Sequence, residues 1–184
     1  MHFGKSICIG LIGLFLIPYN AFAEENINRE GIWGGIDFGV GYIERSFPET
    51  EEEENKAFLG FTVGYTVNPH FLIGIELSGW LYEASNVWEP SKGEGLSQVL
   101  LVTRYYPSRE SGLFSKIGGG YVSHWNNRPG EQRRKSGWGL SLGGGYDLLS
   151  KRNWSITPFL NYSFGEADDQ KHNAVTMGIG VTWH

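Results

Sequence analysis

The chain has 184 residues, a formal net charge of −5 at pH 7 and one cysteine, Cys8. The acidic balance argues against a nucleic acid partner, and Cys8 lies in an N-terminal segment that we expect to be removed, which leaves no disulfide, thiol catalyst or cysteine-type metal site. Glycine accounts for 27 residues and aromatic residues for 15% of the chain, a composition that favours membrane-spanning strands over an ordinary soluble core.

The N-terminal segment has the pattern of a secretory signal peptide. Lys5 supplies a positive charge, and residues 7–17 are apolar but too few to cross a bilayer as a helix. Ala21 and Ala23 flank Phe22 in the small-x-small pattern of a cleavage site. We therefore expect residues 1–23 to be removed and residues 24–184 to form a single domain.

The remainder of the chain is dominated by alternation with a period of two, which is typical of strands. Each predicted strand is about as long as a tilted strand must be to cross a bilayer. The predicted strands are 31–44, 56–67, 70–82, 96–106, 112–124, 136–148, 153–165 and 173–183.

The connections between these strands alternate between short and long. The short ones, 67–70, 107–112 and 149–153, are rich in turn-forming residues, whereas the long ones, 45–55, 83–95, 125–135 and 166–172, carry charges. In membrane barrels the short turns face the periplasm and the long loops face outward. The alternation therefore predicts that both termini are periplasmic.

The two faces of each predicted strand differ in polarity. In 31–44, for example, Phe38 and Val40 share one face, and Asp37 and Gly39 share the other. A soluble carrier barrel needs large apolar residues inside and charges outside, whereas here the charges fall on the small, polar face. Aromatic residues gather near the strand ends, as in interfacial girdles: Tyr42, Tyr65, Phe71, Tyr105, Trp138, Trp154 and Trp183. The pattern predicts an all-β fold, a closed antiparallel eight-stranded transmembrane barrel with no open edge in lipid.

Residues 31–183 resemble the small outer-membrane β-barrel family of the outer membrane protein A and X type. The sharpest local element is the C-terminal pattern Thr176-x-Gly178-x-x-Val181-x-Trp183, which resembles the family's assembly signal, although His184 follows the final aromatic residue. The resemblance implies insertion into the outer membrane of a Gram-negative bacterium by the barrel assembly machinery, and contact with outer-membrane lipids and lipopolysaccharide. Members act as envelope anchors, adhesins or resistance factors, and membership does not choose among these roles.

Five charged residues are predicted to face the barrel interior: Asp37, Glu76, Arg104, Lys116 and Asp147. The strand directions place all five in the middle or periplasmic half of the barrel. An eight-stranded barrel is just wide enough for side chains to fill it, so we expect a buried ion-pair network that plugs the lumen. The alternative is a narrow or gated ion path.

Two predicted loops carry runs of one charge. The first loop has an acidic run over residues 49–54, which indicates a solvated loop or, alternatively, weak divalent-cation binding. The third loop has a basic group: Arg128, Arg133, Arg134 and Lys135. This group either pairs with the acidic loop across the mouth or contacts lipopolysaccharide phosphates or another polyanion, because arginine binds phosphate in a bidentate manner.

No recognisable catalytic pair emerges from the sequence. Ser123 and His124 are adjacent and should point to opposite faces of a strand, and His172 has no serine beside it. We therefore expect a monomeric, non-enzymatic outer-membrane protein without a cofactor, which anchors the envelope or binds an extracellular ligand through its loops. The alternatives are a lipid A-modifying enzyme, either a deacylase or an acyltransferase, and a small-solute channel.

Overall fold

The computed structural model describes residues 29–46, 51–84, 93–128, 131–151, 153–168 and 170–184. Among these residues, no helix has the length and apolar character to cross a membrane. The described residues form nine strands: β1 (Ile32–Ser46), β2 (Glu51–Asn68), β3 (Phe71–Ala84), β4 (Gly93–Tyr105), β5 (Leu113–Arg128), β6 (Glu131–Tyr146), β7 (Leu148–Lys151), β8 (Trp154–Ala167) and β9 (Gln170–Trp183).

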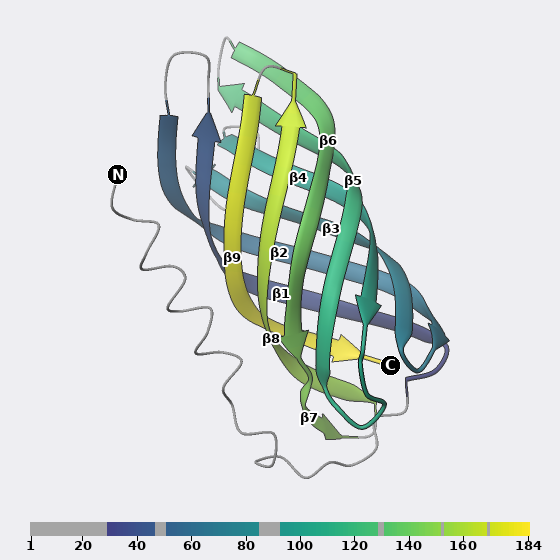
Figure 1. The fold of residues 1–184 in the computed structure, drawn as a ribbon. Helices are drawn as coiled ribbons and strands as arrows, with labels where there is room; N and C mark the ends of the chain where they lie inside the picture. The colour runs from purple at the N-terminus through teal and green to yellow at the C-terminus, as the bar shows by residue number, and fades with distance from the viewer. Residues whose placement is uncertain (1–28, 47–50, 85–92, 129–130, 152, 169) are drawn as a thin grey trace.

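The long strands form a closed barrel (Figure 1). From β1 to β6 each strand pairs antiparallel with the next, β8 pairs with β9, β1 pairs with β9, and β6 pairs with β8. The predicted eight-stranded antiparallel barrel is therefore confirmed. The short β7 is an addition to it, and it pairs with the start of β8 within the predicted 149–153 turn. Closure gives the long strands a neighbour on both sides, which a lipid environment requires.

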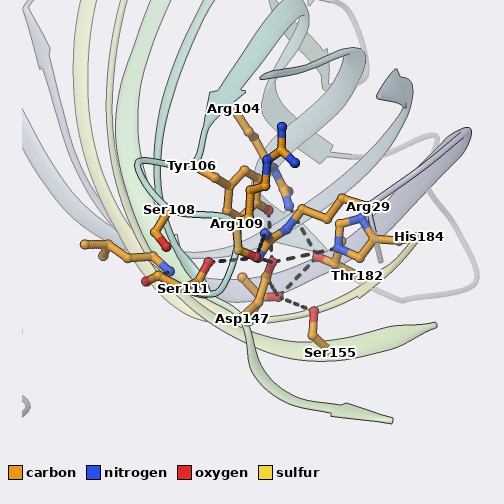
Figure 2. Close-up of polar contacts among 12 residues, drawn as sticks. Arg29, Arg104, Tyr106, Ser108, Arg109, Ser111, Asp147, Ser155, Thr182 and His184 are labelled. Carbon is orange, nitrogen blue, oxygen red and sulfur yellow. Dashed lines mark hydrogen bonds and ion pairs between the residues drawn. The ribbon is translucent and has the colours of Figure 1, made fainter. Parts of the chain in front are cut away.

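The barrel has two distinct ends. The turn end carries the connections after β2, β4, β6 and β7, together with Arg29 and His184 (Figure 2), and the connections after β1, β3, β5 and β8 lie at the opposite end, the loop end. Within the turn end, the side chain of Asn68 accepts backbone hydrogen bonds from His70 and Phe71 at 2.9 and 3.1 Å, which closes a tight turn.

The outer face is a belt of exposed apolar side chains. It includes Phe38, Val40, Phe61, Val63, Ile75, Leu77, Leu101, Ile117, Leu142, Met177 and Ile179. Toward the turn end it is bordered by Tyr65, Phe71, Tyr105, Trp154 and Trp183, and toward the loop end by Tyr121, Trp138 and Tyr162, all of them exposed. An apolar belt between aromatic rims matches the two interfaces of a bilayer.

The interior contains more large apolar side chains than the sequence pattern predicted. A buried cluster toward the loop end consists of Ile43, Phe58, Trp80, Leu96, Val122, Phe159 and Ala174, and a second, toward the turn end, consists of Trp33, Leu72, Tyr106 and Phe114. In residues 99–102 of β4 both faces are apolar, because Leu100 and Val102 point inward while Val99 and Leu101 point outward. A stretch that is apolar on both faces has no alternation of polarity, so the sequence pattern does not show which of its side chains face the lumen.

The strands extend further at the loop end than predicted. Residues 51–54 of the acidic run form the start of β2 and pair with residues 43–46 of β1, so this part of the run is not a loop. The basic group also lies on strands, with Arg128 at the end of β5 and Arg133, Arg134 and Lys135 on β6. Antiparallel strands continue to pair wherever their backbone N–H and C=O groups can meet, whatever the side chains are. A strand that is polar on both faces has no alternation of polarity, so the sequence pattern does not reveal it. Glu49 and the predicted signal peptide lie outside the described residues.

The C-terminal pattern lies on β9 between β1 and β8. Val181 and Trp183 face outward, whereas Thr176 is buried in the lumen and accepts a 3.1 Å hydrogen bond from the Trp80 indole. A Cβ at Gly178 would collide with the Phe38 carbonyl oxygen of β1. Glycine at this position therefore permits the close approach of the strands that closes the barrel.

Candidate functional site

The turn end of the lumen is closed by a group of polar side chains around one carboxylate. We call Arg29, Tyr106, Asp147, Thr157 and His184 the base clasp; Figure 2 labels all of these except Thr157. The Tyr106 and Thr157 hydroxyls donate hydrogen bonds of 2.9 and 2.8 Å to the two carboxylate oxygens of Asp147. Arg29 Nη2 and His184 Nε2 each lie 3.8 Å from Asp147 Oδ2.

The base clasp ties both ends of the described chain to the barrel. The Arg29 guanidinium donates to the carbonyl oxygens of Ser111 and Arg109 at 2.9 and 3.2 Å, and its Cζ lies 3.8 Å from the centroid of the Tyr106 ring. At the other terminus, the His184 amide donates to the Asn153 carbonyl oxygen at 2.9 Å. Segments far apart in the sequence therefore meet at Asp147.

Asp147 and Tyr106 lie in connections outside the long strands. Their surroundings favour an ionised Asp147 carboxylate and a protonated Tyr106 phenol. Burial raises the pKa of the Asp147 carboxyl, but His184, Arg104 and the Thr157 hydroxyl more than offset this and hold its pKa below the usual value. Burial, together with the Asp147 charge, raises the pKa of the Tyr106 phenol well above its usual value. The phenol therefore keeps the proton that it donates to Asp147.

The middle of the lumen contains a buried ion pair. Lys116 Nζ lies 2.7 Å from Glu76 Oε2, and both side chains are almost fully buried. Ser78 donates to Glu76 at 3.2 Å and accepts from the Gln98 amide at 2.9 Å. These hydrogen bonds offset part of the desolvation cost of the pair.

Arg104 and Asp37 lie in the same part of the lumen. Arg104 is 2% exposed, donates to the Thr182 hydroxyl at 3.3 Å, and has its guanidinium Cζ 4.6 Å from the Trp33 ring centroid and 4.8 Å from that of Phe114. Asp37 is buried on β1, opposite Gly60 on β2 and Gly180 on β9. The two glycines leave room for its carboxylate in a narrow barrel.

The five predicted interior charges are thus all buried, but they are not joined as a single chain of ion pairs. Glu76 and Lys116 pair directly, whereas Asp147 lies just beyond β6 and meets Arg29 and His184. Arg29, Tyr106 and His184 were not among the residues predicted from the sequence to form a site. For His184 the sequence contained a signal, because this residue departs from the C-terminal pattern.

The described basic side chains near the loop end lie on different sides of the barrel wall. Arg134 is exposed, and its Nε donates to the outward-facing Ser123 hydroxyl at 2.9 Å. Lys135 is the next residue on β6 and pairs in register with His124, so it faces the lumen mouth. For Arg128 and Arg133 only the strand positions belong to the described structure.

The alternation also separates Ser123 from His124. The Ser123 hydroxyl meets Arg134, whereas His124 Nε2 lies 3.4 Å from Arg45 Nη1 inside the mouth. The two side chains therefore do not form a nucleophile–base pair. Within the described part of the chain, no cluster of three or more histidine, aspartate or glutamate side chains could hold a metal ion.

Comparison with solved structures identifies the fold. Ail, the attachment invasion locus protein of Yersinia pestis, solved with the heparin analogue sucrose octasulfate, matches with a TM-score of 0.57 and 14% identity over 83% of this chain and 99% of its own. Neisserial surface protein A matches with a TM-score of 0.57 and 15% identity over 84% of this chain and 97% of its own. The chain has the fold of the small eight-stranded outer-membrane β-barrels.

A third outer-membrane barrel agrees with this assignment. The N-terminal barrel domain of Pseudomonas aeruginosa OprF has a TM-score of 0.51 and 16% identity over 84% of this chain and 97% of its own. No family model and no curated protein sequence matches the chain. At these identities the likeness establishes the fold alone, and the role of the protein has to be argued from its own residues.

Proposed function

We propose that the protein is a non-enzymatic barrel of the Gram-negative outer membrane, with a filled lumen and with its loop end as the binding surface. The proposal rests on one feature of the outer wall, which is apolar along the middle of the barrel and charged beyond it toward the loop end. An apolar belt ends at Tyr121 and Trp138, and β6 continues beyond it with the exposed Arg134. A guanidinium just above an aromatic rim is placed to meet the phosphates of lipopolysaccharide.

The proposed topology places both termini in the periplasm, with residues 1–23 removed as a signal peptide. The turn end is compact and tied by short connections, as periplasmic ends of membrane barrels are. An epitope tag after His184 should be inaccessible to antibody on intact cells and accessible after the outer membrane is permeabilised. Labelling of intact cells would contradict this orientation.

Lipopolysaccharide binding tests the surface role. The double variant Arg133→Ala/Arg134→Ala should bind lipopolysaccharide about tenfold more weakly than the parent, because charge-assisted contacts to phosphate are lost. Arg109→Ala is the matched control, since Arg109 is an exposed arginine at the turn end. Equal binding by all three proteins would refute the lipopolysaccharide contact.

Planar-bilayer recordings test the filled lumen. The layers of buried side chains around Trp80, Glu76 and Tyr106 support a plug, so we expect no stable porin-size conductance steps. Reproducible large steps that are absent from protein-free bilayers would favour the channel alternative.

A further inference from the structure

Beyond the aromatic rim, toward the loop end, the outer wall of β5 and β6 presents an indole and a guanidinium side by side. Trp125 of β5 pairs in register with Arg134 of β6, and both residues have the outward parity of the exposed rim residues on their strands. Directly opposed residues on one face of a sheet lie close enough to touch. We call these two residues, together with Ser123 and Ser136 of the neighbouring outward row, the β5–β6 patch.

The Arg134 guanidinium is held at one side and open at the other. Its Nε donates a 2.9 Å hydrogen bond to the Ser123 hydroxyl, and Ser123 is itself buried. Ser123 is fixed in turn, because the Ser97 hydroxyl donates to its carbonyl oxygen at 3.3 Å. Within the described part of the chain, the Nη1 and Nη2 groups of Arg134 have no hydrogen-bond or ion-pair partner. These two groups are the end of the guanidinium that can donate to two oxygens of one phosphate.

The Trp125 indole lies over a glycine of the neighbouring strand. Trp125 pairs in register with Gly95 of β4, and a Cβ at Gly95 would collide with the indole ring. The ring therefore occupies the space that the glycine leaves open, and the side chain stays partly exposed. Among the described residues, none accepts a hydrogen bond from the indole N–H. The wall thus supports an apolar ring that carries an available donor at its edge.

The β5–β6 patch lies next to the rim of the apolar belt. Tyr121 and Trp138 pair in register at this rim and are 44% and 50% exposed. Trp125 lies four residues beyond Tyr121, which is about 13 Å along an extended strand. Between the two rows stand the short side chains of Ser123 and Ser136. A ring bound there would meet hydroxyl groups on the wall and aromatic side chains on either side.

We propose that the β5–β6 patch binds a phosphorylated sugar in the headgroup of an outer-leaflet glycolipid, with the phosphate on Arg134 and the sugar ring on the Trp125 indole. This inference rests on the proposed function and names the part of lipopolysaccharide that is recognised. The C–H face of a sugar ring packs on an aromatic ring, and its hydroxyls accept from an N–H donor. A glycolipid is favoured over a soluble glycan because the patch is on the outer wall beside the rim, where lipid headgroups lie.

The test is equilibrium titration of the folded, detergent-solubilised barrel with lipopolysaccharide and with phosphatidylglycerol, which carries a phosphate but no sugar ring. Trp125→Leu should weaken lipopolysaccharide binding about tenfold and leave phosphatidylglycerol binding unchanged, because only the ring contact is lost. Trp125→Phe keeps an aromatic ring and should retain most of the affinity. Arg134→Ala should weaken the binding of both lipids, because both present a phosphate.

Trp154→Leu is the matched control, because Trp154 is an exposed rim tryptophan at the turn end. It should bind lipopolysaccharide as the parent does, and unboiled gel migration checks that each variant is folded. A competition experiment on the parent protein needs no variant. Glucose 1-phosphate should displace lipopolysaccharide at about a tenfold lower concentration than inorganic phosphate does, because it adds the sugar ring to the phosphate.

The outcomes separate this inference from the proposed function. Weaker lipopolysaccharide binding by Arg134→Ala together with unchanged binding by folded Trp125→Leu would overturn the sugar contact and leave the phosphate contact standing. Unchanged binding by both variants would overturn both. Displacement by glucose 1-phosphate and inorganic phosphate at the same concentration would overturn the sugar contact. So would an equal loss of phosphatidylglycerol binding in Trp125→Leu, because the indole would then act as a general lipid anchor.

Discussion

At the turn end, the Asp147 carboxylate accepts hydrogen bonds from Tyr106 and Thr157 and lies beside two cationic or ionisable groups, Arg29 and His184. At the loop end, the Glu54 carboxylate lies 3.3 Å from Arg45 and 3.0 Å from Lys56. Both ends contain charged groups, but the Asp147 side chain is fully buried, whereas the Glu54 side chain is 39% exposed. Removing one partner of a buried charged group is costly, whereas a solvent-exposed ion pair contributes little. The difference predicts that the polar contacts of the turn end contribute more to stability than the ion pairs of the loop end.

The largest effect should come from removing the centre of the base clasp. Asp147→Ala leaves Arg29 buried without its carboxylate and leaves the Tyr106 and Thr157 hydroxyls without acceptors. We expect it to lower the free energy of unfolding by about 4 kcal/mol, as when one partner of a buried pair is lost. Urea titration in detergent micelles, followed by tryptophan fluorescence, measures this. A loss under about 1 kcal/mol would mean that the base clasp contributes no more to stability than a solvent-exposed ion pair does.

Breaking the ion pair in the middle of the lumen should lower the free energy of unfolding by less than Asp147→Ala does, and replacing both partners should restore most of the loss. Glu76→Leu leaves Lys116 charged and buried, so we expect a loss of about 3 kcal/mol. The double variant Glu76→Leu/Lys116→Met should regain most of this loss, because an apolar pair of similar volume avoids the desolvation penalty. The same urea titration measures both variants. A double variant as unstable as the single one would show that the pair itself, and not its desolvation, governs stability.

Acid should weaken the base clasp selectively. The folded-state pKa of Asp147 lies below its usual value near 3.8, so its contribution to stability is complete above that value and is lost as the pH falls through the folded-state pKa. The stability difference between the parent and Asp147→Asn should therefore shrink as the pH is lowered below about 4. Paired urea titrations at several pH values measure it. A difference that stays constant into strong acid would contradict the lowered pKa.

The smallest effect should come from the ion pairs of the loop end. Glu54 is 39% exposed at its side chain and lies 3.3 Å from Arg45 and 3.0 Å from Lys56. Glu54→Ala should change the free energy of unfolding by less than about 1 kcal/mol, because solvent-exposed pairs contribute little. This variant is also the matched carboxylate control for Asp147→Ala. A loss as large as that of Asp147→Ala would mean that both ends contribute equally to stability.

The alternation of residues along the chain is enough to predict the barrel, its strand order and the outer belt. A two-residue period with apolar residues on one face, as in Phe38 and Val40, can be satisfied in lipid only by a closed sheet, so the eight-stranded fold followed from local pattern and elementary hydrogen-bonding physics. It also placed Asp37, Glu76, Arg104 and Lys116 on the inner face by parity alone.

Which of these residues meet depends on how the barrel closes. Arg29, Asp147 and His184 are far apart in the chain and share no periodic signal, so only barrel closure brings them together. The strand extension that carries Arg134 and Lys135 is polar on both faces, and the inward Leu100 and Val102 lie in a short stretch of β4, residues 99–102, that is apolar on both faces. Alternation cannot reveal either case. Contacts across the lumen depend on strand register around the whole barrel, which no local stretch of sequence encodes.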